Sequence, residues 1–282
     1  MDGEGRYAYL FGGRNGGDAF NDLWRYDLAG DRWELLAPAA APKARFGHTA
    51  TWVAGVGLVV FSGQVGSTFF NDTWAYAPEA NSWQELPSGG AVPEPRYGSC
   101  AGLAPDGRLW ISHGFTDEGR FFDTRAYDFA KGAWADITRE DPVPVIRCLH
   151  DCFWTPDGQF VLYGGQTNGV AALGDLWVRQ ESGDWQPQAD PPLAARQLYA
   201  VASIGATAWV FGGADKDRTP LRDLWTLDLR DFSWHEVKLG GSIPSARLSA
   251  TLIADPARAR LLLFGGKNGQ AAYDDLWVLK LT

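Results

Sequence analysis

The chain has 282 residues and carries 25 lysines and arginines against 34 aspartates and glutamates, so its formal net charge is −9. We expect no nucleic-acid partner, because neutralising phosphates needs a basic face. We expect no membrane partner either, because no apolar run approaches the roughly 18 residues of a spanning helix. The first five residues lack the basic and apolar regions of a signal peptide, which favours a cytoplasmic location.

One pattern returns along the whole chain. An apolar strand that ends in a Gly-Gly-like pair recurs every 48 to 53 residues, and a fixed period of this length marks a repeat architecture. In chain order, the second residues of these pairs are Gly13, Gly63, Gly114, Gly165, Gly213 and Gly266.

Three further features accompany the pairs. An Asp-Leu-Trp-like triplet follows each pair, beginning at Asp22, Asp72, Asp123, Asp175, Asp223 and Asp275. A second tryptophan follows the triplet, at Trp33, Trp83, Trp134, Trp185 and Trp234. A proline-containing loop then leads to an arginine that opens the next apolar stretch, at Arg45, Arg96, Arg147, Arg196 and Arg247.

Each unit reads as four short strands joined by turns rich in glycine, aspartate and proline. No long segment has helical periodicity. A period near 50 with four strands per unit is typical of the kelch propeller, in which each unit forms one blade. The sequence therefore predicts an all-β, six-bladed kelch-type β-propeller with four-stranded antiparallel blades. We expect a single domain over 1–282, with repeat units at about 1–38, 39–89, 90–140, 141–190, 191–240 and 241–282.

The chain resembles the kelch-repeat propellers along its whole length. The segment Pro42-Lys43-Ala44-Arg45-Phe46-Gly47-His48-Thr49 is typical of the branch that includes host cell factor, Rab effectors with kelch motifs and the plant nitrile-specifier proteins. The resemblance implies a galactose-oxidase-like central-domain fold. It also implies an interaction module, because most members of the family are interaction modules and a minority are enzymes.

The repeat is incomplete at both ends of the chain. The first unit begins with its second strand, near Tyr7, and the last unit stops before the tryptophan of a fourth strand. We therefore expect four whole blades and two blades of three strands.

The five repeat arginines admit two roles. The spacing from each arginine to the aspartate of the same unit is 27 or 28 residues, which favours a bidentate structural pair. Alternatively, the arginines form a ring at the mouth of the central channel and bind an anionic ligand. Strand topology places the arginines, the glycine pairs and the variable loops at one end of the blades, which is the expected binding face.

The glycine pairs and the tryptophans are expected to be structural, the tryptophans filling the space between blades. Function is sought where the repeat breaks. The third unit has His113 in the glycine position and Arg125 in the tryptophan position, and the fourth unit reads Arg147-Cys148-Leu149-His150-Asp151-Cys152. The predicted ligand-binding residues are therefore the five arginines together with His113, Arg125 and His150.

No metal and no cofactor are predicted. Alternate residues on one strand lie about 6.6 Å apart, which is too far for Cys148, His150 and Cys152 to reach one tetrahedral ion easily. The copper and iron patterns of kelch enzymes are not visible in the chain. Catalysis is the alternative hypothesis, an epimerase or hydrolase acting on an anionic carbohydrate without a metal, with the weak acid-base candidates His113, Asp117, Glu118 and Asp151.

The sequence thus favours a monomeric, non-catalytic kelch module. It would bind a protein partner, through an acidic or phosphorylated segment, or a small anionic ligand, on the face of the arginine ring. The sequence does not identify the partner.

Overall fold

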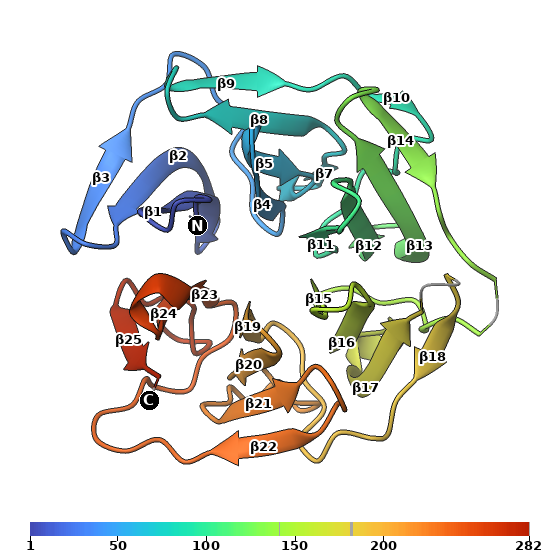
Figure 1. The fold of residues 1–282 in the computed structure, drawn as a ribbon, viewed down its shortest axis with the longest axis vertical. Coiled ribbons are helices and arrows are strands. Elements are labelled where there is room, and N and C mark those ends of the chain that lie inside the picture. Colours follow the sequence, from blue (N-terminus) through green and yellow to red (C-terminus); the bar gives the residue numbers. More distant parts are fainter. Residues whose placement is uncertain (141, 181–182, 282) are drawn as a thin grey trace. The chain divides into compact units, whose positions relative to one another are not determined.

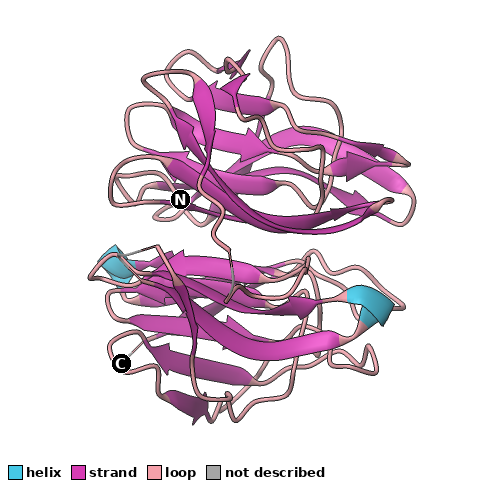
Figure 2. Ribbon diagram, turned by 90° about the vertical axis from the view of Figure 1, so that its right-hand side faces the viewer, coloured by secondary structure: helices cyan, strands magenta, loops and turns pink. Residues whose placement is uncertain are grey.

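The computed structural model describes residues 1–140, 142–180 and 183–281. The chain forms two compact units, Met1–Thr138 and Arg139–Thr282. Within the described residues, strands make up nearly all the regular structure of both units (Figure 2), and helix is confined to two short 3₁₀ turns, η1 (Asn168–Val170) and η2 (Pro256–Arg258). No helix in the described residues is long and apolar enough to cross a membrane.

The first unit contains three principal sheets and one small hairpin (Figure 1). Its strands are β1 (Tyr7–Asn15), β2 (Asp18–Asp27), β3 (Arg32–Leu36), β4 (Thr49–Val53), β5 (Gly57–Phe61), β6 (Gln64–Val65), β7 (Thr68–Phe69), β8 (Thr73–Ala77), β9 (Ser82–Glu85), β10 (Gly89–Gly90), β11 (Cys100–Leu103), β12 (Leu109–Thr116), β13 (Gly119–Asp128) and β14 (Ala133–Asp136). The sheet orders are β1-β2-β3, β4-β5-β8-β9 and β10-β14-β13-β12-β11, with β6-β7 as the separate hairpin.

The second unit repeats this plan with three further sheets. Its strands are β15 (Asp151–Trp154), β16 (Phe160–Gln166), β17 (Ala172–Arg179), β18 (Trp185–Pro187), β19 (Ala200–Ile204), β20 (Thr207–Phe211), β21 (Leu224–Asp228), β22 (Trp234–Val237), β23 (Thr251–Asp255), β24 (Arg260–Phe264) and β25 (Leu276–Lys280). The sheet orders are β15-β16-β17-β18, β19-β20-β21-β22 and β23-β24-β25.

These sheets confirm the predicted fold class. All six are blades of the propeller type, in which consecutive strands pair antiparallel, and the first and last have three strands. The third blade differs from the expectation, because β10 adds to it in parallel alongside β14. Glycine makes this approach possible: Gly90 has a φ of +73°, and a Cβ there would lie 2.3 Å from the carbonyl oxygen of Trp134.

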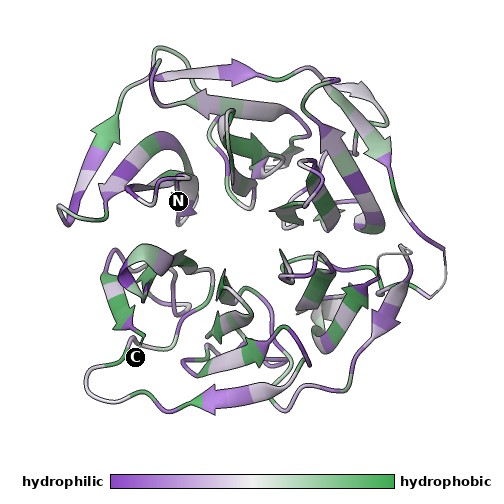
Figure 3. Ribbon diagram, viewed as in Figure 1, coloured by the Kyte–Doolittle hydropathy of each residue, from purple (hydrophilic) through white to green (hydrophobic). Residues whose placement is uncertain are grey.

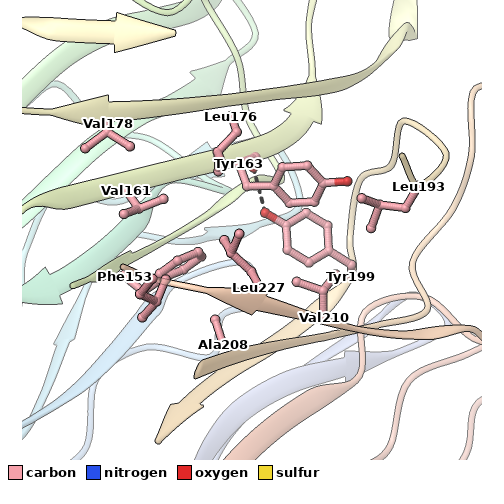
Figure 4. Packing of buried hydrophobic residues seen from close by; sticks show 11 residues of the cluster. Phe153, Val161, Tyr163, Leu176, Val178, Leu193, Tyr199, Ala208, Val210 and Leu227 are labelled. Carbon is pink, nitrogen blue, oxygen red and sulfur yellow. Dashed lines mark hydrogen bonds between the residues drawn. The ribbon is translucent and has the colours of Figure 1, made fainter. Parts of the chain in front are cut away.

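Apolar strands supply the core between neighbouring blades. Every residue of β5 and β16 is buried, and both strands carry hydrophobic residues (Figure 3). In the second unit, one buried cluster joins residues of β15, β16 and β17 to residues of β20 and β21 (Figure 4). Within that cluster, the Tyr199 hydroxyl donates to the carbonyl oxygen of Tyr163 at 2.6 Å, which satisfies a polar group inside an apolar layer.

Three of the second tryptophans, Trp83, Trp134 and Trp234, pack against an aromatic ring of the preceding blade, as expected. Trp83 lies 4.9 Å from Phe11 of the preceding blade, and Trp134 lies 4.8 Å from Phe61, measured between ring centroids. The tryptophan of the Asp-Leu-Trp triplet has a different role. Its indole N–H donates to the triplet aspartate, as Trp74 does to Asp72 at 2.8 Å. Only one of the two tryptophan positions is therefore primarily a packing position.

Candidate functional site

Each repeat arginine forms a bidentate pair with the aspartate of its own unit. Nη1 donates to Oδ1 at 2.6 to 2.9 Å, and Nη2 donates to Oδ2 at 2.7 to 3.0 Å. At most 1% of each arginine is exposed. The pairs are Arg45–Asp72, Arg96–Asp123, Arg147–Asp175, Arg196–Asp223 and Arg247–Asp275. This geometry is the structural role that the 27- or 28-residue spacing favours.

The remaining arginine donors are also directed at the protein. In the second blade, Arg45 Nε donates to the Lys43 carbonyl at 3.0 Å and Nη1 donates to the Ser62 carbonyl at 2.9 Å. The guanidinium also lies over the Phe70 ring, 4.2 Å from its centroid. Four of its five N–H groups are thereby used. Because the guanidinium groups of the repeat arginines are enclosed by the protein, their ligand-binding role stays a prediction.

The paired aspartates are held in their charged form. Burial acts to raise the pKa of Asp72, but the hydrogen bonds and charge of Arg45 outweigh it, and the pKa lies below its ordinary value. The same balance lowers the pKa of Asp123, Asp175 and Asp223. Each carboxylate is partly exposed. Five of the six blades therefore carry a compact, neutralised ion pair at the end that is the predicted binding face.

Arg125 takes over the hydrogen bond of the tryptophan that it replaces. In the other five units, the triplet tryptophan Nε1 donates to the aspartate Oδ2 at 2.6 to 2.8 Å. In the third unit, Arg125 Nε donates to Asp123 Oδ2 at 2.9 Å, and its Nη1 pairs with Asp136 at 3.1 Å. The substitution thus conserves the donor, while a ligand-binding role for Arg125 stays a prediction.

His113 occupies a left-handed position that glycine fills in four of the six units. Its φ is +57°, against +60° at Gly12 and +65° at Ser62, and a non-glycine residue pays about 1–2 kcal/mol there. The side chain is fully buried, and its Nδ1 lies 2.7 Å from Ser112 Oγ. Ser112 Oγ in turn lies 3.1 Å from Thr124 Oγ1. The histidine therefore belongs to a buried polar chain rather than to the surface.

The other predicted residues differ widely in exposure. Asp117 and Glu118 are exposed in the turn between β12 and β13, whereas His150 is buried and packs where Gly165 leaves room. Burial raises the pKa of Asp151 to about 7, although its Oδ1 accepts the Cys152 N–H. Their catalytic and ligand-binding roles stay predictions. Among the described residues, no group of three or more His, Cys, Asp and Glu side chains is placed to hold a metal.

Sequence reasoning missed a chain of aromatic rings in the first unit, of which Phe69 lies on β7 and Phe115 on β12. Phe46 lies 5.8 Å from Tyr97, Tyr97 lies 6.3 Å from Phe115, and Phe115 lies 6.1 Å from Phe69. All four rings are partly exposed. One sequence feature could have indicated these rings: the residue after the repeat arginine is aromatic at Phe46 and Tyr97.

Two arginines complete this surface. The Arg14 guanidinium lies 4.2 Å from the centroid of Phe46, and that of Arg120 lies 5.2 Å from the centroid of Phe115. The six residues come from three successive blades and from the predicted binding face. We call Arg14, Phe46, Phe69, Tyr97, Phe115 and Arg120 the aromatic–arginine cluster. Aromatic residues and arginine are the types most enriched in protein interfaces.

Blades of this kind, with an arginine, a glycine pair and an aspartate repeated in register, define a kelch-type propeller. The model described as the KLHDC2/KLHL20/DRC7 Kelch-repeats domain matches residues 1–165 and 142–282, so the chain belongs to the kelch-repeat family. Members of this family mediate protein interactions. The predicted family is thus confirmed.

Individual relatives are distant. The chain is 28% identical over 206 residues to Acyl-CoA-binding domain-containing protein 5 of Arabidopsis thaliana, a match that covers 68% of this chain and 31% of that protein. It is 28% identical over 201 residues to the Rab9 effector protein with kelch motifs of Mus musculus, covering 66% and 52% respectively. It is 26% identical over 215 residues to host cell factor 1 of Rattus norvegicus, covering 68% and 10%. The chain therefore matches about half or less of the length of these relatives.

Proposed function

We propose that this chain is an interaction module that binds a segment of a protein partner at the aromatic–arginine cluster. The observation that carries the proposal is the continuous, partly exposed chain of rings from Phe46 through Tyr97 to Phe115. Partly exposed rings offer apolar area at low entropic cost, and aromatic residues often dominate the binding energy of protein interfaces.

The arginines favour an acidic segment. Arg14 and Arg120 lie on the rings and reach solvent, Arg14 being exposed and Arg120 partly exposed. A guanidinium on an aromatic face still presents its edge N–H groups to a carboxylate or a phosphate. We therefore propose a partner segment that places an acidic or phosphorylated residue beside an apolar one. We thus assign the predicted preference for an anionic ligand to Arg14 and Arg120 instead of the five enclosed repeat arginines.

Displayed random peptides provide the test. Peptides enriched on the wild-type chain are synthesised, and their affinities are measured by fluorescence polarisation against Phe46→Ala, Phe115→Ala and Arg14→Glu. Each variant should weaken binding at least tenfold, since interface anchors of this type contribute about 2 kcal/mol or more. Phosphorylated and unmodified versions of each acidic peptide separate the two kinds of anion.

Leu35→Ala is the matched control, because Leu35 is 55% exposed on β3 of the same unit. It should leave the affinity unchanged. Equal affinity of wild type, Phe46→Ala and Phe115→Ala for every enriched peptide would exclude the cluster as the binding surface. Enrichment of basic rather than acidic peptides would contradict the charge preference alone.

A further inference from the structure

Two rows of side chains form the centre of the aromatic–arginine cluster, and the first row lies on the second blade. Phe46 and Gln64 exchange both backbone hydrogen bonds, at 3.0 and 2.9 Å, and Gln64 pairs with Phe69 across the β6–β7 hairpin. Directly opposed residues of antiparallel strands project their side chains from the same face. Phe46, Gln64 and Phe69 therefore form a row with the polar residue in the middle.

The third blade carries the second row. Tyr97 and Phe115 exchange both backbone hydrogen bonds at 2.9 Å, and Phe115 pairs with Arg120 across the β12–β13 hairpin. Two edge-to-face ring contacts join the rows. Phe46 lies 5.8 Å from Tyr97, and Phe69 lies 6.1 Å from Phe115. The polar residue of the first row thus stands between two pairs of rings.

Gln64 brings a carboxamide to this aromatic surface. Its Nε2 donates to the Gly66 carbonyl at 2.7 Å, and within the part of the chain that the structure describes this is the one hydrogen bond of the side chain. A carboxamide has two N–H donors and an oxygen with two lone pairs. The second N–H and Oε1 therefore remain for a ligand, and the residue is only half-buried.

The bond to Gly66 fixes the orientation of this carboxamide. Gly66 lies in the turn between β6 and β7 with a φ of +56°, a conformation that glycine adopts without strain. Its carbonyl holds Nε2 in place before any ligand arrives. A group that is already ordered loses less conformational entropy on binding.

We propose that the Gln64 carboxamide hydrogen-bonds the main chain of the partner segment, with Oε1 accepting a backbone N–H and Nε2 donating to a backbone C=O. The inference rests on the proposed function and specifies how the segment is bound. A residue in an extended strand directs its own N–H and C=O to the same side. The segment therefore crosses the cluster in an extended conformation, with neighbouring side chains on the two pairs of rings.

The surroundings of Gln64 favour a polypeptide as the occupant. A carboxamide carries no charge, and it matches both the donor and the acceptor of a peptide group. Rings on either side offer contact area to the neighbouring side chains and exclude water, which strengthens the hydrogen bonds between them. Arg120, at the end of the second row, attracts an acidic residue of the same segment.

Backbone-modified peptides test the hydrogen bonds directly. The tightest-binding peptide from the display experiment is synthesised with one amide at a time replaced by an ester, which removes a single N–H and keeps every side chain. At one position, the ester should weaken binding to the wild-type chain about tenfold, the equivalent of one hydrogen bond. Gln64→Met should bind the unmodified peptide about tenfold more weakly, and the same ester should then cost less than about twofold.

Two controls separate this role from the structural one in the β6–β7 turn. Gln84→Met should bind like wild type, since Gln84 is exposed on β9 of the same blade, and thermal unfolding checks that Gln64→Met is folded. In the wild-type chain, the side-chain NH₂ resonances of Gln64, assigned by their loss in Gln64→Met, should shift on peptide binding. Those of Gln84 should stay in place.

The outcomes distinguish this inference from the proposed function. Wild-type affinity of Gln64→Met, together with weakened binding by Phe46→Ala, would overturn the inference and leave the cluster as the binding surface. An ester effect of equal size in wild type and Gln64→Met would also overturn it, because another residue would then bind that N–H. Equal affinity of wild type, Gln64→Met and Phe46→Ala, or a display that enriches no peptide, would overturn both.

Discussion

Replacing Asp223 by alanine should lower the free energy of unfolding by about 3 kcal/mol, because it leaves a buried guanidinium without its counter-charge. Arg196 has no exposed surface, and it donates to the two Asp223 oxygens at 2.9 and 2.8 Å. Breaking a buried pair by removing one partner costs about 3–5 kcal/mol. The lower end applies here, since 29% of the Asp223 side chain is exposed and water can partly solvate the arginine.

Asp22→Ala is the matched control within the same chain. Asp22 accepts a tryptophan N–H at 2.7 Å, as Asp223 does at 2.8 Å, but it pairs with no arginine among the described residues. Its replacement should therefore cost about 1 kcal/mol, the value of one ordinary hydrogen bond. The difference between the two variants, about 2 kcal/mol, isolates the contribution of the buried guanidinium.

Urea unfolding followed by tryptophan fluorescence provides the measurement. Asp223→Ala should unfold at a clearly lower urea concentration than Asp22→Ala, with similar slopes. A double variant, Arg196→Met with Asp223→Leu, should recover part of the loss, because it removes the uncompensated charge as well. Equal losses of unfolding free energy for Asp223→Ala and Asp22→Ala would refute the reasoning. The pair with Arg196 would then add nothing to the stability that the tryptophan hydrogen bond provides.

Three further outcomes follow from the same contacts. Arg125→Trp should change the free energy of unfolding by less than about 1 kcal/mol, because it restores the indole N–H donor of the other units. Arg125→Leu should lower it by about 1–3 kcal/mol, and chemical denaturation of the two variants measures the difference. Asp151 has a folded pKa of about 7 against an ordinary 3.8, so the folded state holds the proton longer and stability should fall as pH rises from about 4 to about 7, by up to about 4 kcal/mol. Asp151→Asn should flatten that part of a stability–pH profile, and an unchanged profile would argue against the burial of this carboxyl. Gly47→Ala should lower the melting temperature of the protein far more than Gly55→Ala. Both glycines have positive φ, but a Cβ at position 47 would lie 2.0 Å from an atom of Tyr97, whereas nothing lies within 4 Å of a Cβ at position 55.

The sequence was sufficient to predict the repeat and its antiparallel blades, although not the fifth strand β10 of the third blade. It favoured the pairing of each arginine with its own aspartate over a ligand-binding role. These properties depend on spacing along the chain. An interval of 27 residues covers the hairpin of β4 and β5 and the loop after it, so the chain returns from Arg45 to Asp72 at the same end of the blade. The interval is 27 or 28 residues in all five units that contain the arginine. Likewise, the three-stranded first and last sheets follow from which repeat segments are present.

The tertiary structure decided what these residues do. Spacing along the chain does not determine burial, so only the tertiary structure shows that Arg96 is enclosed while Arg14 is exposed beside Phe46. Nor does a substitution pattern reveal which atom is conserved: Arg125 looks like a break in the repeat, yet its Nε replaces an indole N–H.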